Sequence, residues 1–164
     1  MNGIYLLLGT NNGDKLNQLQ NASKWLTSYE IEIVRSSSIY ESEPWGIANQ
    51  DWFLNMVLEI ATHQNEQELL GTILDIEKQM GRIRDLKWGP RLIDIDILYY
   101  ENVILATKDL TIPHPEIQNR RFTLLPLAEL ARDEIHPLLK QNHKFLLDNC
   151  PDNGIVNKTN LSIS

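Results

Sequence analysis

The segment from residue 88 to 100, WGPRLIDIDILYY, carries two aspartates two positions apart in a stretch that otherwise predicts a β-strand. Asp is depleted in strands, and residues i and i+2 of a strand project from the same face. Asp94 and Asp96 would then lie about 7 Å apart and repel each other by about 2 kcal/mol at an effective dielectric constant of ~20. One interpretation is the solvated face of a sheet. The other is a magnesium site, because Mg²⁺ prefers carboxylate oxygens and the cation reverses the repulsion.

Basic residues are dense just before the aspartates, where Arg82, Arg84, Lys87 and Arg91 fall within ten positions. Such a run can simply be a solvated loop. A guanidinium group, however, matches a phosphate in bidentate geometry, and magnesium-binding acids beside phosphate-binding arginines are the components of phosphoryl transfer. The sequence has no G-x-x-x-x-G-K-[ST] motif, which excludes a P-loop enzyme.

Aromatic and amide side chains form another candidate group. In the predicted strand FLNMVLEIAT, Phe53 and Asn55 share the face opposite Leu54 and Met56, and the loop that carries Trp45 could reach them. A flat heterocycle would stack on an aromatic ring and pair with an amide that offers a donor and an acceptor. The alternative is that Phe53 packs in the core and Asn55 caps a loop.

The segment TIPHPEIQNRRF, residues 111–122, holds a histidine on a stiffened loop. His114 lies between two prolines, and Arg120 and Arg121 follow it. An isolated loop histidine can be an ordinary surface residue. A rigidly held one near arginines could instead donate a hydrogen bond to a phosphate.

The elements that must position these groups follow from hydrophobic periodicity. Apolar runs and alternation predict strands, and apolar residues at helical spacing predict two helices, the second with Asn65 and Glu68 as a capping box and Gly81 as its C-terminal cap. The resulting β-α-β-β-α-β order is that of the α+β ferredoxin-like fold, an antiparallel sheet with two helices on one face. The predicted strands are residues 3–9, 31–40, 53–62 and 92–100, and the predicted helices are about 16–28 and 66–80.

The remaining sequence predicts additions to that core. Residues 101–106 could add an edge strand, residues 107–122 have the composition of a loop, and 124–131 and 143–150 are typical of short helices. We expect residues 1–149 to form one domain and residues 150–164 to be a frayed polar tail.

Composition restricts the class of protein. The 164 residues carry a net charge of −7, which argues against binding of nucleic acid or of anionic membranes. The single cysteine, Cys150, rules out an intrachain disulfide and suits a reducing compartment. The histidines lack zinc-ligand spacing, and neither a membrane span nor a signal peptide is expected. We therefore expect a cytoplasmic protein. We also expect a monomer, although no feature of the sequence determines the oligomeric state.

The motifs taken together resemble one family. The segment GRIRDLKWGPRLIDIDIL, residues 81–98, closely resembles the signature of the 6-hydroxymethyl-7,8-dihydropterin pyrophosphokinases of folate biosynthesis. Four other stretches are similar to further motifs of that family in the same order: LGTN (8–11), SEPWG (42–46), FLN (53–55) and TIPHPEIQNRRFTLLPL (111–127). The resemblance implies that ATP gives its β,γ-diphosphate to the hydroxymethyl group of the pterin, with release of AMP.

The resemblance also implies roles for single residues at the phosphates. Asp94 and Asp96 would hold two Mg²⁺ ions that bridge the phosphates, and Asp96 is the nearest candidate for a general base. Arg82 and Arg91 would act on the transferred group.

The remaining implied residues bind the two substrates. Asp109, Pro115 and Leu74 differ from residues that some members have near the nucleotide. The nucleotide-binding residues would be Glu77, Arg84, Trp88, Thr111, His114 and Arg120. The pterin-binding residues would be Ser42, Trp45, Phe53, Asn55 and Phe122, with the two phenylalanines on either side of the ring.

Two other functions compete with this interpretation. A non-catalytic ferredoxin-like module could bind RNA through aromatic residues on its sheet, although the negative charge and the acids on that face argue against it. A D-x-D enzyme of another kind, such as a nucleotidyltransferase, could use a different acceptor. The combination of Phe53, Asn55 and Phe122 suits a pterin better than a sugar or a nucleic acid.

Overall fold

The computed structural model describes residues 1–44, 46, 49–81 and 92–164. Its helices are α1 (Lys15–Ser28), α2 (Glu66–Gln79), α3 (Arg121–Ala131) and α4 (His143–Asp148), with a short 3₁₀ helix at Ile117–Asn119. Its strands are β1 (Ile4–Thr10), β2 (Glu32–Ser36), β3 (Tyr40–Ser42), β4 (Phe53–Ala61), β5 (Asp94–Tyr100), β6 (Leu105–Ala106), β7 (Thr111–Ile112) and β8 (Val156–Lys158).

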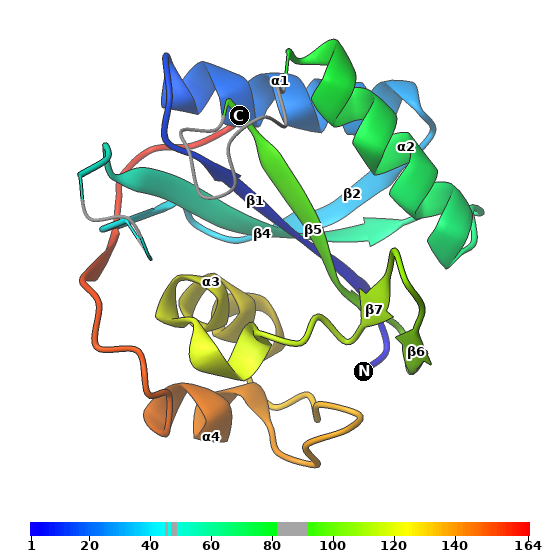
Figure 1. Ribbon diagram of the computed structural model, residues 1–164, viewed down its shortest axis with the longest axis vertical. Helices are drawn as coiled ribbons and strands as arrows, with labels where there is room; N and C mark the ends of the chain where they lie inside the picture. Colours follow the sequence, from blue (N-terminus) through cyan, green and yellow to red (C-terminus); the bar gives the residue numbers. More distant parts are fainter. Residues whose placement is uncertain (45, 47–48, 82–91) are drawn as a thin grey trace.

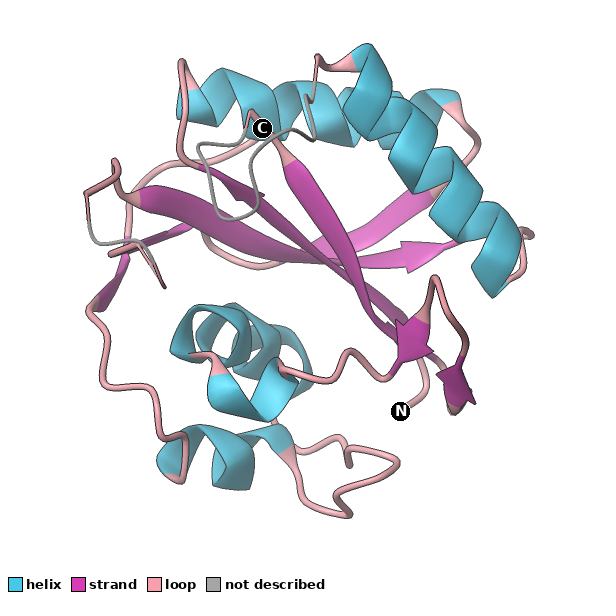
Figure 2. Ribbon diagram, viewed as in Figure 1, coloured by secondary structure: helices cyan, strands magenta, loops and turns pink. Residues whose placement is uncertain are grey.

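The main sheet has six antiparallel strands in the order β5-β1-β4-β3-β8, with β2 also paired to β4. This confirms the predicted β-α-β-β-α-β core and the α+β class. Helices α1 and α2 lie on one face of the sheet, as expected, while the C-terminal helices α3 and α4 lie on the other (Figure 1). Figure 2 shows the result as a sheet between two helical layers.

Alternation along the central strand β1 supplies both cores. Leu6 and Leu8 pack in the core that contains α1 and α2, and Tyr5 and Leu7 pack in the core that contains α3. Every residue of β1 is buried as a result. A strand covered on both faces has this continuous apolar sequence, which explains the run IYLLL.

The predicted limits of α2 are confirmed in detail. The Asn65 side chain accepts a hydrogen bond from the Glu68 backbone N–H at 2.9 Å, and the Glu68 carboxylate accepts one from the Asn65 N–H at 2.8 Å. The helix ends at Met80, and Gly81 follows with φ of 86°. Glycine adopts this left-handed conformation without steric cost, which is why it ends the helix.

The segment predicted as one strand over residues 31–40 is divided into β2 and β3. Ser37 lies at the break, where its N–H donates to the Val57 carbonyl and its Oγ accepts from the Val57 N–H, both at 2.9 Å. The hydroxyl therefore replaces a backbone carbonyl and interrupts the ladder.

Three other segments differ from expectation. Leu105–Ala106 does not extend the main sheet but pairs with β7 in a separate two-stranded sheet. The predicted loop 107–122 contains β7 and the 3₁₀ helix. The C-terminal tail forms β8, which pairs with β3, and is therefore not frayed along that stretch. Within the described ranges, no helix has both the length and the apolar character needed to cross a bilayer.

Two buried histidines near α3 and α4 give the fold a defined response to acid. His143 is fully buried and lies 2.9 Å from the Tyr99 hydroxyl through Nε2, and His136 accepts hydrogen bonds from the Leu138 and Leu139 N–H groups. Burial lowers the pKa of both imidazoles, that of His136 to about 4.

We expect the contribution of these histidines to the free energy of unfolding to be nearly constant above about pH 7.5 and to fall as the pH drops through 6.5. An unfolded histidine takes up a proton near pH 6.5, whereas folded His136 resists protonation down to about pH 4, so the unfolded state binds more protons between these values. His136 alone should contribute a loss of about 2 kcal/mol by pH 5. Urea unfolding of wild type and His136→Asn across this range measures the effect, with exposed His63→Asn as the control. An unchanged pH dependence in His136→Asn would refute the assignment.

Candidate active site

The two aspartates and the amide lie in adjacent positions on one face of the sheet. Gly9 of β1 is paired with Asp94 of β5 on one side and with Asn55 of β4 on the other. In the next row but one along the strands, Leu7 is paired with Asp96 and with Val57. Because Leu7 and Val57 belong to the core beneath α3, both aspartates and Asn55 project toward the α3 side of the sheet.

Gly9 lies between the carboxylates and the amide, and because it has no side chain it leaves space above the sheet there, which we call the floor of the site. Asp94 and Asn55 are two strands apart, about 10 Å between their backbones, and the glycine between them has no side chain. A Cβ atom at position 9 would lie 3.0 Å from Asn55 Oδ1. Sequence reasoning did not assign a role to this glycine, although the end of the apolar run at residue 9 was a signal for one.

Asn55 is held in place by a neighbouring strand. Its side chain is 3% exposed, and its Nδ2 donates to the Ser42 Oγ at 2.7 Å. Ser42 is 2% exposed and is paired in register with Phe53, which is half-buried at the start of β4. The amide therefore has one fixed orientation, with its oxygen directed toward Gly9.

The beginning of α3 lies on the same side of the sheet as Asn55. Phe122 lies in the first turn of α3 and packs at the margin of the core below the sheet. The Arg120 guanidinium carbon is 5.9 Å from the centre of the Phe122 ring, which places a cation beside the aromatic group.

The loop between β3 and β4 is fixed at its end by residues that sequence reasoning had not assigned. The buried Asn11 donates through Nδ2 to Gln50 Oε1 at 3.0 Å and to the Asp51 carbonyl at 3.3 Å. Lys15 Nζ donates to the Trp52 carbonyl at 2.9 Å. Only the LGTN motif, which contains Asn11, pointed toward this arrangement.

His114 is attached to β5 and is held in one tautomer. The backbone N–H of His114 donates to the Leu98 carbonyl. The Nδ1 atom of its ring accepts from the backbone N–H of Glu116 at 3.2 Å, so the ring hydrogen is assigned to Nε2. Burial lowers the pKa of His114 to about 4; the charge of Arg120 acts in the same direction, while Glu116 and Asp94 oppose it. At neutral pH the residue therefore offers a neutral Nε2–H donor near Arg120 and Asp94.

The predicted site residues fall into three groups. Asp94, Asp96, Asn55, Ser42 and Phe53 belong to the main sheet and project toward the face that α3 covers. On the same side, Arg120 and Phe122 lie at the start of α3, and His114 is hydrogen-bonded to β5. Glu77 is 2% exposed in α2, on the opposite helical layer, and Thr111 is exposed in β7. The predicted residues Trp45, Arg82, Arg84, Trp88 and Arg91 lie outside the described residues.

The aspartate pair fits a magnesium ion that is also bound by water and phosphates better than it fits a metal site built only from protein side chains. Both side chains are half-buried on one face of β5. No group of three or more His, Cys, Asp or Glu residues suited to a metal occurs in the part of the chain that the structure describes. Two neighbouring carboxylates match the way Mg²⁺ binds, through one or two acids, water and substrate phosphates.

Comparison with known proteins agrees with the motifs. The family model for 7,8-dihydro-6-hydroxymethylpterin-pyrophosphokinase (HPPK) matches residues 5–132. A 2-amino-4-hydroxy-6-hydroxymethyldihydropteridine pyrophosphokinase of Aquifex aeolicus is 44% identical over 138 residues, which cover 84% of this chain and 86% of the relative. The folic acid synthesis protein FOL1 of Dictyostelium discoideum is 40% identical over 94% of this chain, which spans 23% of that protein.

A solved structure shows the same fold. The crystal structure of wild-type Plasmodium falciparum HPPK-DHPS superposes with a TM-score of 0.72 and 17% sequence identity, covering 90% of this chain and 44% of that one. At this level of identity the match concerns the fold alone, and the chain spans less than half of the solved protein.

Proposed function

The chain belongs to the 7,8-dihydro-6-hydroxymethylpterin-pyrophosphokinase family, and from this premise we propose that it transfers the β,γ-diphosphate of ATP to the hydroxymethyl group of 6-hydroxymethyl-7,8-dihydropterin. AMP is the other product, and the pterin diphosphate enters folate biosynthesis. The observation that carries the assignment to this site is the row Asp94–Gly9–Asn55, in which a candidate metal ligand and a hydrogen-bonded amide share the sheet face beneath α3.

The pterin ring lies on the amide side of Gly9. Asn55 offers its oxygen and the remaining Nδ2 hydrogen to the pyrimidinone edge, because the other Nδ2 hydrogen is donated to Ser42 Oγ. Phe53 and Phe122 stack on the two faces of the ring, and backbone groups of Ser42 and Trp45 contact the same edge. Binding in this manner orients the hydroxymethyl group toward the carboxylates.

The phosphates lie on the aspartate side of Gly9. Two Mg²⁺ ions, held by Asp94 and Asp96, would neutralise charge on the phosphate oxygens and align them for displacement. His114 donates from Nε2 to a phosphate oxygen, and Arg120 contributes a positive charge beside it. Arg84, Trp88 and Thr111 are assigned to the nucleotide, and Arg82 and Arg91 to the transferred group. Glu77, which is buried in α2 on the other helical layer, would act only through the sheet and not by direct contact.

The chain supplies positioning and electrostatics more than covalent chemistry. The hydroxymethyl oxygen attacks Pβ in line with the leaving AMP oxygen, and holding both in one site replaces a bimolecular encounter. Asp96 is our candidate for the group that accepts the hydroxyl proton as the bond to phosphorus forms.

The test is an assay with ATP, Mg²⁺ and 6-hydroxymethyl-7,8-dihydropterin in which AMP, ADP and pyrophosphate are followed separately. AMP that forms only when the pterin is present supports diphosphate transfer. Formation of ADP would instead indicate transfer of a single phosphoryl group, and pyrophosphate would indicate nucleotidyl transfer. A folded wild-type protein that forms none of these would contradict the proposed function.

Gly9→Ala is expected to lower kcat/KM for the pterin by about tenfold, because the new methyl group would displace Asn55 and occupy the floor of the site. Gly71→Ala is the matched control, since a Cβ at that exposed α2 position contacts nothing within 4 Å and alanine favours a helix. Steady-state kinetics with a thermal melt of each variant measures both effects. Equal kcat/KM values for the two variants would show that pterin binding does not need the space above Gly9.

A further inference from the structure

The last strand of the chain lies along the edge of the sheet beside the proposed pterin pocket. We call residues 152–159 the C-terminal strap. Its strand β8 pairs with β3, with Val156 opposite Ser42. The pairing continues at both ends, where the Glu43 N–H donates to the Ile155 carbonyl at 3.1 Å and the Thr159 N–H donates to the Ile39 carbonyl at 2.9 Å. The strap therefore borders the whole of β3 and the first residue of the loop after it.

The same strap also holds the beginning of α3. Asp152 accepts a hydrogen bond from the Arg121 N–H at 2.9 Å through one carboxylate oxygen and from the Gly154 N–H at 2.8 Å through the other. The residue that precedes α3, Arg120, makes no side-chain cap of its own. Asp152 thus acts as the helix cap from a distant part of the sequence, with its negative charge at the favourable end of the helix dipole.

A further contact joins the strap to the later part of α3. Glu129 accepts hydrogen bonds from the Tyr40 hydroxyl at 2.7 Å and the Ser38 N–H at 3.0 Å, and Lys158 Nζ lies 3.7 Å from the same carboxylate. The strap, β3 and α3 are therefore tied to one another at two separate places.

The junction at Gly154 leaves no space for a side chain. A Cβ there would lie 2.9 Å from an Asp152 carboxylate oxygen and 3.2 Å from Glu43 Oε1. That Glu43 oxygen in turn accepts from the Ile155 N–H at 2.8 Å. The close packing fixes the capping carboxylate and the start of the loop after β3 relative to each other.

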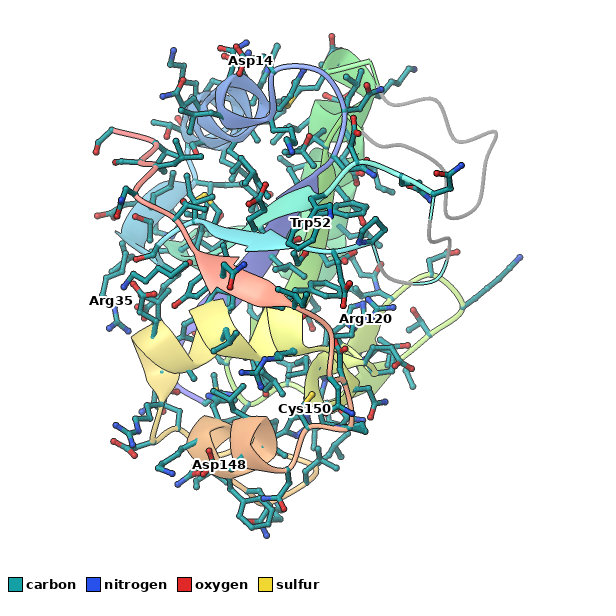
Figure 3. All side chains as sticks on the ribbon, turned by 90° about the vertical axis from the view of Figure 1, so that its left-hand side faces the viewer. Asp14, Arg35, Trp52, Arg120, Asp148 and Cys150 are labelled. Carbon is teal, nitrogen blue, oxygen red and sulfur yellow. The ribbon has the colours of Figure 1, made fainter. Side chains whose placement is uncertain are left out.

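These contacts connect the two groups of residues that we assign to the pterin, which we call the Asn55–Ser42 wall and the Phe122 wall. Ser42, which orients Asn55, belongs to β3, and Phe122 belongs to the first turn of α3. Figure 3 shows the chain passing from α4, near Cys150, along the start of α3 at Arg120 to the strand beside β3. In Figure 1 the same segment continues across the sheet edge to the layer that contains α1.

We propose that the C-terminal strap is a positioning element that sets the separation between the Asn55–Ser42 wall and the Phe122 wall, and so determines affinity for the pterin. Asp152 is its central positioning residue. The inference rests on the proposed function, since the walls are those assigned to pterin binding. Most of the groups assigned to the nucleotide are held by a different element, because His114 is attached to β5, which also carries both aspartates. Arg120 is shared, because it directly precedes α3.

The test compares Asp152→Ala with Asp148→Ala. Both variants remove one carboxylate, but among the residues that the structure describes Asp148 pairs with exposed Lys144 of α4 alone, at 2.6 Å. We expect Asp152→Ala to raise KM for 6-hydroxymethyl-7,8-dihydropterin about tenfold, while kcat changes less than twofold and KM for ATP rises at most about threefold, through Arg120. Asp148→Ala should match wild type in all three constants. A change of all three constants together, or an unchanged pterin KM, would overturn the inference.

A second pair of variants keeps the test decisive if Asp152→Ala is unstable. Asn157→Pro removes an N–H from the middle of β8, opposite Glu41, while Asn157→Ala removes only an exposed side chain. The same selective rise in pterin KM is expected for the proline variant alone. If wild type forms pterin-dependent AMP but the two variants of each pair have the same KM for the pterin, the strap inference fails while the proposed function stands. If wild type forms no AMP, the proposed function fails.

Discussion

Replacement of Asp96 by asparagine is expected to lower kcat by about 10³-fold, a loss of about 4 kcal/mol of transition-state stabilisation. Asparagine has the same shape as aspartate but lacks its charge, so the pair with Asp94 would retain one anionic ligand. The phosphate charge that develops during transfer would then be poorly neutralised. Initial rates of AMP formation across a magnesium titration measure the loss, and added Mg²⁺ should not restore the wild-type rate.

Asp109→Asn is the matched control for this prediction. Asp109 is exposed, and its replacement makes the same change in net charge away from β5. Its rate should stay within twofold of wild type, which would also show that the departure from the family at this position has little effect on the chemistry. Circular dichroism and thermal melts show whether each variant is folded. Activity of folded Asp96→Asn within tenfold of wild type would refute the proposal that Asp94 and Asp96 hold the magnesium ions.

The sequence predicted the aspartate face because a strand has a period of two. Ile93, Ile95 and Ile97 belong to the core beneath α1 and α2, which directs Asp94 and Asp96 to the other side. The same argument separated Asn55 from Leu54 and Met56. The alternation of side chains along a strand extends over only a few residues, so a short stretch of sequence was sufficient to predict which face each side chain occupies.

The second helical layer could have been inferred but was not. An all-apolar strand such as IYLLL is typical of burial on both faces of a sheet, whereas our prediction placed helices on one face only. The sequence of the C-terminal tail gave no comparable indication that it forms β8 and pairs with β3. Thr159 bonds to Ile39 across 120 positions, and a three-residue polar strand has no periodicity that indicates its partner.

Asn55→Asp is expected to lower kcat/KM for the pterin by about 10³-fold while the affinity for an ATP analogue stays the same. The aspartate would keep the size of the side chain and could accept a hydrogen bond from the Ser42 hydroxyl, so the fold should be retained. It would lose both N–H donors and place a buried anion against the acceptor atoms of the pyrimidinone edge. Isothermal titration with each ligand separates the two affinities.

Ser42→Ala gives the graded comparison that identifies the cause. It removes the oxygen to which Asn55 Nδ2 donates at 2.7 Å but leaves the amide in place, so only orientation is lost. We expect about a tenfold fall in kcat/KM for the pterin, between wild type and Asn55→Asp. If Asn55 instead only stabilised the loop after β3, the two variants would reduce ATP and pterin binding in equal proportion. A loss confined to the pterin and greatest in Asn55→Asp is expected only if the amide contacts the substrate directly.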